Sequence, residues 1–286
     1  MRHADGLTHA AAVLIRGGLT SGMVALLLAL SSSPALSDGQ PQPWQVTFQK
    51  AASPVMERIT ALHDYITLVM IGVVVFVLLL LAVVIVRFNA RANPVPRTFS
   101  HNTALEVAWT AIPVLILLVI AVPSFKLLYY MDRTSEADLT LKVTGHQWYW
   151  SYEYPDHNLA FDSFMKDEAS LGPNDPRLLA VDNEVVIPVG ATVRVVMTSQ
   201  DVIHAWAVPA LGVKTDSMPG RLNETWIRAD RPGTYYGQCS ELCGVNHGFM
   251  PIAVRAVSDQ DFKIWVEKTQ ARLGTGGGSL LAFLKP

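Results

Sequence analysis

The segment 239–250 places two thiols, an imidazole and a thioether within twelve residues: Cys239, Cys243, His247 and Met250. Thiolate and imidazole groups bind soft or borderline metal ions, so these side chains indicate copper or zinc. The methionine favours copper, because a thioether recurs at a weak, long position in copper electron-transfer sites, whereas zinc prefers cysteine, histidine and carboxylate. We therefore predict a metal site in this segment.

A second imidazole is available from His204, which lies in an alternating stretch that we expect to be a strand facing the cysteine loop. Two other interpretations use the same thiols. Two cysteines in an exported domain can form a disulfide, and a Cys2His2 set can hold structural zinc. The disulfide leaves His204, His247 and Met250 without a role.

A single blue-copper centre uses one cysteine, so the second thiol of the loop is surplus to it. Two thiolates that bridge two copper ions would use every ligand. In this pattern the chain resembles the dinuclear copper A site of the cytochrome c oxidase subunit II family. The likeness extends from about residue 51 to 257 and includes the segments 145–154, 201–209 and 216–223.

The resemblance implies six copper ligands, two of them bridging: Cys239 and Cys243 between both ions, His204 and Met250 on one ion, and His247 with the backbone carbonyl of Glu241 on the other. It also implies that the Glu241 carboxylate binds a magnesium or manganese ion shared with the catalytic subunit. A carboxylate suits such a hard cation, as a thiolate suits copper.

The aromatic run 148–154 has a period of two, so Trp150 and Tyr152 are expected in the core. The resemblance implies a different role for Trp148, at the surface where cytochrome c docks and passes its electron. Candidate acidic residues around it, each of which could equally be a solvated surface residue, are Glu153, Asp156 and Asp201.

The whole chain has 286 residues, of which 50% are hydrophobic and only 16% charged, a balance that suggests membrane segments. Residues 1–37 are typical of a secretory signal peptide. Arg2 and Arg16 precede a short apolar core, 23–30, and small residues follow it up to Ser37, after which we predict cleavage. The apolar core is too short to span a bilayer.

Two uncharged stretches, about 66–86 and 107–125, are each long enough to cross a membrane and predict a transmembrane hairpin over 63–130. The loop between them carries Arg87, Arg91 and Arg97 and no acid, which places it in the cytoplasm by the positive-inside rule. An exported segment, 38–62, and the domain after the hairpin then lie outside.

Glu106 stands at the cytoplasmic start of the second span, three residues after Thr103. That spacing is typical of a capping box, which would give the carboxylate a structural role. The resemblance implies instead that Glu106 lies at the mouth of a proton pathway. Both interpretations stay open.

The region 135–268 holds 18 acidic and 11 basic residues, a net charge of −7. Short strands separated by turn signals predict an antiparallel sandwich or barrel: 139–143, 147–154, 185–189, 192–198 and 224–229. The resemblance implies an all-β cupredoxin-like sandwich over 135–270, with the copper loop at one end. A closing helix that begins near Gln260 and a flexible tail, 271–286, complete the expected layout.

The resemblance implies that the chain is the electron-accepting subunit of a bacterial oxidase. Electrons would pass from cytochrome c through copper A to haem in the catalytic subunit, which reduces oxygen to water and translocates protons. The expected location is the inner membrane, with both ends in the periplasm. Expected partners are the catalytic and other oxidase subunits, cytochrome c and lipids, but no nucleic acid.

Two other function classes require sequence features that differ from those of this chain. A copper-free subunit II of a quinol oxidase would lack the copper ligands, and all six are present in this sequence. A nitrous-oxide-reducing enzyme would carry a large histidine-rich catalytic domain, and this chain has only 8 histidines.

Overall fold

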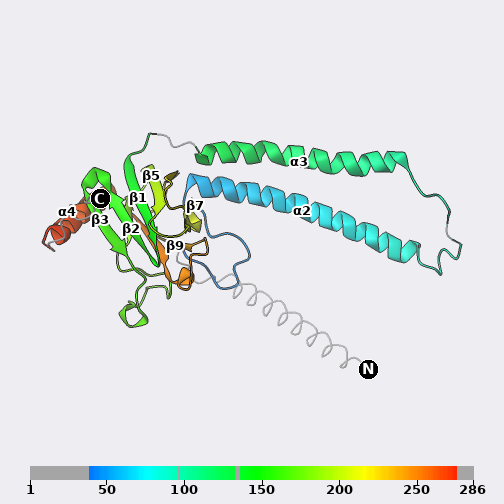
Figure 1. Ribbon diagram of the computed structural model, residues 1–286. Coiled ribbons are helices and arrows are strands. Elements are labelled where there is room, and N and C mark those ends of the chain that lie inside the picture. Colours follow the sequence, from blue (N-terminus) through cyan, green and yellow to red (C-terminus); the bar gives the residue numbers. More distant parts are fainter. Residues whose placement is uncertain (1–38, 96, 133–135, 276–286) are drawn as a thin grey trace, which may run out of the picture. The chain divides into compact units, whose positions relative to one another are not determined.

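The computed structural model describes residues 39–95, 97–132 and 136–275 (Figure 1). The predicted signal peptide and most of the predicted tail lie outside these residues. Two long helices come first, and a β domain with a C-terminal helix follows them.

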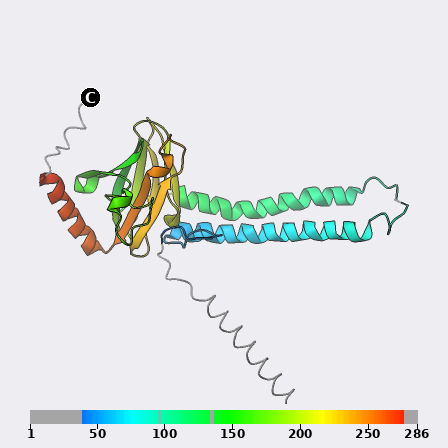
Figure 2. The same cartoon turned by 90° about the horizontal axis from the view of Figure 1, so that it is seen from below.

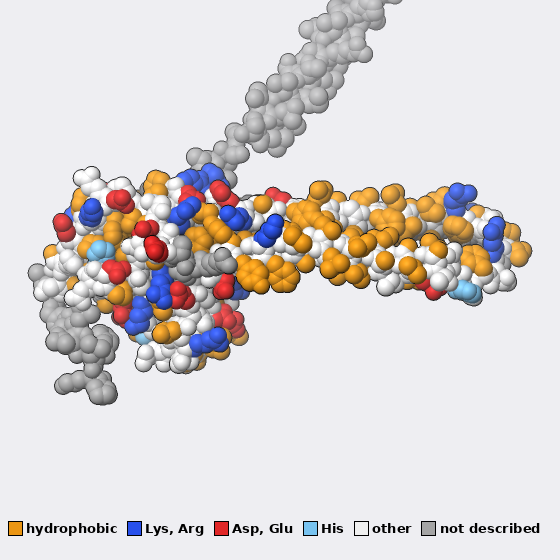
Figure 3. Space-filling model, turned by 90° about the horizontal axis from the view of Figure 1, so that it is seen from above, with side chains coloured by type: hydrophobic (Ala, Val, Ile, Leu, Met, Phe, Trp, Pro, Cys, Tyr) orange, Lys and Arg blue, Asp and Glu red, His pale blue; other side chains and the backbone are white. Residues whose placement is uncertain are grey.

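The helices α2 (Pro54–Arg87) and α3 (Thr103–Asp132) each extend beyond the predicted spans and are long and apolar enough to cross a membrane. None of the residues in either apolar window is buried within the chain. Apolar side chains cover the hairpin along its length, whereas charged groups are mixed over the β domain (Figure 3). The two helices run side by side (Figure 2). Their exposed apolar surface is suited to contact with lipid or with another membrane subunit.

The start of α2 is hydrogen-bonded to the β domain. Ser53 is its N-cap: the hydroxyl accepts a hydrogen bond from the Met56 N–H at 2.9 Å and donates to the carbonyl of Leu211 at 2.8 Å. Ala52 adds a backbone hydrogen bond to the Ala210 carbonyl at 2.9 Å. The first helix therefore begins in a segment that is hydrogen-bonded to the domain.

The start of α3 differs from the predicted capping box. Thr103 is the first helical residue, and the Oδ1 atom of Asn102 accepts a hydrogen bond from the Leu105 N–H at 3.3 Å, so Asn102 is the cap. Glu106 is then the fourth helical residue, whereas a capping box needs an acidic or amide side chain at the third. In the part of the chain that the structure describes, no hydrogen bond or ion pair engages the Glu106 carboxylate, so the capping interpretation is wrong.

The β domain is a sandwich of two five-stranded sheets, ordered β3-β2-β1-β5-β8 and β4-β10-β9-β6-β7. The strands are β1 (Leu139–His146), β2 (Tyr149–Tyr154), β3 (Leu159–Ser163), β4 (Val185–Pro188), β5 (Val193–Ser199), β6 (His204–Val208), β7 (Val213–Ser217), β8 (Asn223–Ile227), β9 (Gly233–Cys239) and β10 (Pro251–Val257). The predicted sandwich is confirmed. Its purely antiparallel pairing is wrong, because β1 pairs with β5, and β10 with β4, in parallel.

The core lies between the sheets and confirms the predicted period of two along β2. Trp150, Tyr152 and Tyr154 are fully buried. The indole N–H of Trp150 donates to the Met250 carbonyl at 3.1 Å, and that of Trp206 to the Tyr152 hydroxyl at 3.2 Å. The first bond ties the end of the cysteine loop to the opposite sheet, and the second joins the two sheets through β6 and β2.

The helix α4 (Asp259–Thr275) packs against β3 and β4, the edge strands on one side of the sandwich. Phe262 and Val266 are its buried residues that join the core. The opposite edge of the first sheet, β8, contacts α3.

Candidate metal centre

Three neighbouring strands bring the predicted copper ligands together. His204 is the first residue of β6 and Cys239 the last of β9, and these strands pair with Trp206 opposite Cys239. The chain then passes through a 3-10 turn, η4 (His247–Phe249), to Met250, which directly precedes β10. Because β10 and β6 both pair with β9, the loop closes back onto His204.

Two of the six predicted donors are the thiols, whose sulfur atoms lie 3.8 Å apart. The other four divide into two pairs, one beside each sulfur. Beside the sulfur of Cys239 lie His204 Nδ1 at 3.8 Å and the Glu241 carbonyl oxygen at 3.4 Å. Beside the sulfur of Cys243 lie His247 Nδ1 at 3.5 Å and Met250 Sδ at 3.6 Å.

Most of this cluster is buried. His204, Cys239, Cys243 and Met250 each expose 6% or less of their surface. The ring of His247 is half-buried, and Glu241 is exposed. The cluster therefore has a dry interior with one edge that faces outward.

The donor set fits a pair of copper ions. The cysteines are free thiols, and their sulfur separation is far from the bond length of about 2.05 Å in a disulfide. Two sulfurs bound to the same ion at about 2.3 Å each can lie up to about 4.6 Å apart. The observed separation of 3.8 Å therefore allows both thiolates to bind one ion. A tetrahedral zinc ion would leave two of the six donors unused. Two ions that share both sulfurs use all six, each ion taking one terminal donor beside each cysteine.

The two thiols differ in acidity. Burial raises the pKa of Cys239, but hydrogen bonds with His204 and the Glu241 backbone lower it below its ordinary value overall. Burial and the neighbouring Cys239 raise the pKa of Cys243 well above its ordinary value. A bound cation is what stabilises both groups as thiolates at once.

A carboxylate orients the buried imidazole. His204 Nε2 lies 2.8 Å from Asp201 Oδ1, and Asp201 Oδ2 accepts a hydrogen bond from the Gln147 backbone N–H at 2.6 Å. A carboxylate on the outer nitrogen of a ligand histidine fixes the ring and its tautomer. Asp201, predicted from sequence as a docking residue, positions the His204 ring in the structure.

Trp148 packs directly on the cysteine loop. Its Nε1–H donates to the Cys243 carbonyl at 3.2 Å, and Gln147 Nε2 donates to the same oxygen at 2.8 Å. Gly244 makes this approach possible: its φ is +123°, and a Cβ there would lie 2.9 Å from the Trp148 ring. Sequence reasoning missed both Gln147 and Gly244. Gly244 could have been noticed because it directly follows Cys243, where a glycine indicates a close approach of another group.

The other two predicted docking acids lie elsewhere. Glu153 is five residues along β2 from Trp148, which is about 16 Å at the rise of a strand, and its carboxylate pairs with Lys142 at 2.7 Å. Asp156 accepts a hydrogen bond from the Thr140 N–H at 2.7 Å. The structure brings Asp201 to the Trp148 corner but leaves Glu153 and Asp156 away from it.

Comparisons with known proteins bear on the whole chain. Residues 139–257 match the family described as cytochrome C oxidase subunit II, periplasmic domain, and residues 41–127 match the one described as its transmembrane domain. A probable cytochrome c oxidase subunit 2 from Rickettsia bellii (strain RML369-C) is 54% identical over 244 residues, covering 85% of this chain and 91% of the relative.

A cytochrome c oxidase subunit 2 from Zea mays is 50% identical over 232 residues, covering 79% of this chain and 89% of the relative. The crystal structure of the periplasmic domain of subunit II from Bradyrhizobium japonicum is 55% identical with a TM-score of 0.46, covering 49% of this chain and 99% of that one. The chain therefore belongs to the cytochrome c oxidase subunit II family, and its role is that of this subunit in the oxidase.

Proposed function

We propose that this subunit accepts electrons from cytochrome c at Trp148 and delivers them through a dinuclear copper centre to haem in the catalytic subunit. That subunit would reduce oxygen to water and translocate protons. The observation that carries the proposal is the cluster of six donors, four of them around a thiol pair 3.8 Å apart, next to Trp148. The presence of all six argues against a copper-free relative.

When bound, the copper pair takes up and releases one electron at a time. The residues of the chain position that event. Asp201 holds the His204 ring towards the sulfur of Cys239, and the Trp148 N–H connects the half-buried indole to the carbonyl of Cys243, a proposed bridging ligand. Burial of the thiols excludes water from between the donors.

The chain is a membrane protein with a periplasmic domain, and we propose that it lies in the bacterial inner membrane. In this layout the signal 1–37 is removed, 38–62 and the copper domain 135–270 are periplasmic, and the hairpin 63–130 contacts lipid and other oxidase subunits. The arginine-bearing loop between the helices supports the orientation.

Electrostatic attraction should speed the encounter with a basic cytochrome c, because the domain carries a net charge of −7 over 135–268. Charges on exposed surfaces are screened beyond about 8 Å at physiological ionic strength, so added salt should slow association steeply. Stopped-flow oxidation of cytochrome c by the assembled oxidase, over a range of salt, measures this.

The variants Glu153→Gln and Asp156→Asn test the predicted acidic ring away from the copper ligands. A reduced salt dependence places the altered residue in the docking surface. Association rates that do not change with salt would contradict electrostatic docking altogether.

A proton-uptake role for Glu106 predicts that Glu106→Gln assembles normally, keeps its copper and slows the proton-coupled phase of turnover. An ionisable group at the membrane end of a span is a functional candidate, and here the competing cap role is removed because Asn102 caps the helix. Asn102→Ala is the matched control: it should cost about 0.5 to 2 kcal/mol of stability without slowing turnover. A parent rate in Glu106→Gln across neutral and alkaline pH would reject the assignment.

The Glu241 side chain is exposed while its carbonyl faces the sulfur of Cys239, so one residue can serve two metals. One carboxylate supplies a single site for a hard cation, and the remaining ligands would come from the catalytic subunit. Glu241→Ala should therefore lose manganese from oxidase grown with that metal and keep its copper. Full manganese occupancy in this variant would mean that the ligand lies elsewhere.

A further inference from the structure

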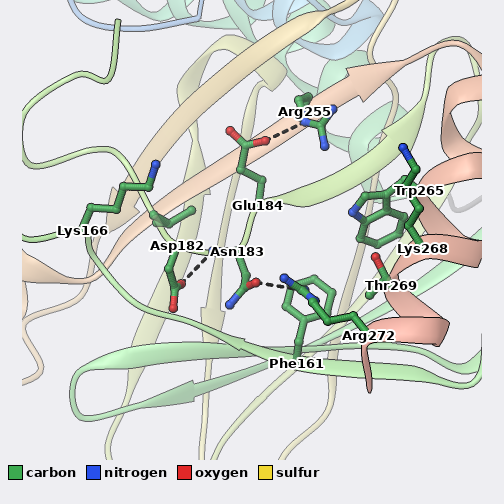
Figure 4. Close-up of a pocket in the computed structure, with 11 residues that line it drawn as sticks. Phe161, Lys166, Asp182, Asn183, Glu184, Arg255, Trp265, Lys268, Thr269 and Arg272 are labelled. Atoms are coloured by element: carbon green, nitrogen blue, oxygen red, sulfur yellow. Dashed lines mark hydrogen bonds and ion pairs between the residues drawn. The ribbon is translucent and has the colours of Figure 1, made fainter. Parts of the chain in front are cut away.

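A pocket of about 440 Å³ lies between α4 and the edge of the sandwich and shares no residue with the copper site (Figure 4). Its lining comes from β3 and the loop after it, from the loop before β4, from β10 and from α4. Sites for small molecules have volumes in this range. The pocket is at the β3 and β4 edges, whereas α3 contacts the opposite edge of the first sheet.

Positive charge dominates this pocket although the domain around it is acidic. The charged side chains that line it are Lys166, Arg255, Lys268 and Arg272 on the positive side, and Asp182 and Glu184 on the negative side. A concentration of cations within a domain of net negative charge indicates a local preference for anions.

The acidic groups are already engaged. Glu184 pairs with Arg255 at 2.6 Å, and Asp175, just outside the lining, pairs with Lys166 at 2.8 Å. Asp182 accepts hydrogen bonds from two backbone N–H groups at 2.7 Å each. Four basic and two acidic side chains line the pocket, and two of the basic ones, Lys268 and Arg272, come from α4.

Two of the basic residues of α4, Lys268 and Arg272, line the same pocket. Arg272 donates to Asn183 Oδ1 at 3.1 Å, and the amide of Asn183 is itself fixed by its donation to the Asp162 carbonyl at 3.0 Å. Lys268 is four residues before Arg272, so both lie on one face of the helix. Trp265, one turn earlier, forms an aromatic wall beside them (Figure 4).

We propose that this pocket binds a small anion of the phosphate class, held by Lys268 and Arg272. A planar guanidinium matches two phosphate oxygens at once, and an ammonium group adds a point charge and further donors. A pocket of this volume suits a small molecule.

Inorganic phosphate is the probe, added to the purified, copper-loaded oxidase and followed by the broadening of its phosphorus resonance. We expect saturable binding that weakens about tenfold in Lys268→Ala and in Arg272→Ala, because each loses a charge-assisted hydrogen bond. Lys263→Ala is the matched control: this lysine is exposed on the same helix but does not line the pocket, so binding should be unchanged.

Glu184→Gln gives an effect of opposite sign. It removes a carboxylate and releases Arg255 from its ion pair, so phosphate should bind more tightly. Unsaturable binding to the parent oxidase, an equal loss in Lys263→Ala, or weaker binding in Glu184→Gln would each overturn the proposal. Succinate tests the class of anion: failure to displace phosphate supports the phosphate class, and displacement at equal concentration would overturn it.

Discussion

Cys243→Ser is expected to leave a folded subunit that no longer holds two copper ions and no longer accepts electrons from cytochrome c at a measurable rate. The sulfur of Cys243 lies within 3.8 Å of the other thiol, of the His247 ring and of the Met250 thioether. A hydroxyl is a poor ligand for copper, so the substitution would remove one of the two proposed bridging ligands. The oxygen nearly replaces the sulfur in shape, which preserves the fold.

Metal analysis and electron spin resonance of the assembled oxidase measure this result. The parent should show two coppers per subunit and an unpaired electron shared equally between them, and the variant should show the signal of a single ion. Cys239→Ser should behave in the same way, because both thiolates are proposed to bridge the two ions. Ser240→Ala, between the two, is the control and should keep the paired centre. A shared signal that persists in Cys243→Ser would contradict bridging, and one copper or zinc in the parent would contradict the centre itself.

Gly244→Ala should slow electron uptake from cytochrome c while the copper centre stays loaded. A methyl group at this position would lie 2.9 Å from the Trp148 ring and 3.1 Å from the Gln147 amide, and the backbone φ of +123° disfavours a side chain. The Trp148 indole must then move off the Cys243 carbonyl. Misplacement by about 1 Å can cost on the order of a hundredfold in rate, so we expect a loss of about tenfold to a hundredfold.

Gly248→Ala is a matched control in the same loop, because a Cβ there meets no atom within 4 Å. It should keep the parent rate. Trp148→Phe keeps a ring but loses the N–H, so it should slow uptake and leave the affinity for cytochrome c nearly unchanged. Stopped-flow kinetics with the copper spectrum recorded on the same samples separates these effects. A parent rate in both Gly244→Ala and Trp148→Phe would remove this corner from the electron path.

The loop ligands could be predicted from sequence because they are local. Cys239, Cys243, His247 and Met250 need only one loop to meet, and their chemistry narrows the metal before any fold is known. His204 is 35 residues before Cys239 and reaches the site through the pairing of β6 with β9. Its placement opposite the loop was predicted from the alternating stretch around it, and the family resemblance implied its role as a copper ligand.

Other features escaped prediction because they depend on packing. The parallel pairs β1 with β5 and β4 with β10 join distant segments that no turn signal connects. The spacing of Thr103 and Glu106 imitates a capping box, but Asn102 is the cap and the helix begins one residue earlier than that box requires. Glu153 is close to Trp148 in sequence, yet a strand carries it away at about 3.3 Å per residue.

The way the donors are held has a consequence for the energetics of electron transfer. Asp201 holds the His204 ring, Trp150 holds the Met250 carbonyl, and paired strands hold His204 and Cys239. Ligands anchored by the protein on their outer sides have little freedom to shift when the charge of the site changes. The reorganisation energy of the centre should therefore be small. A small reorganisation energy lets electrons pass quickly in response to a slight difference in potential, so little of the free energy that the oxidase can conserve is lost at this step.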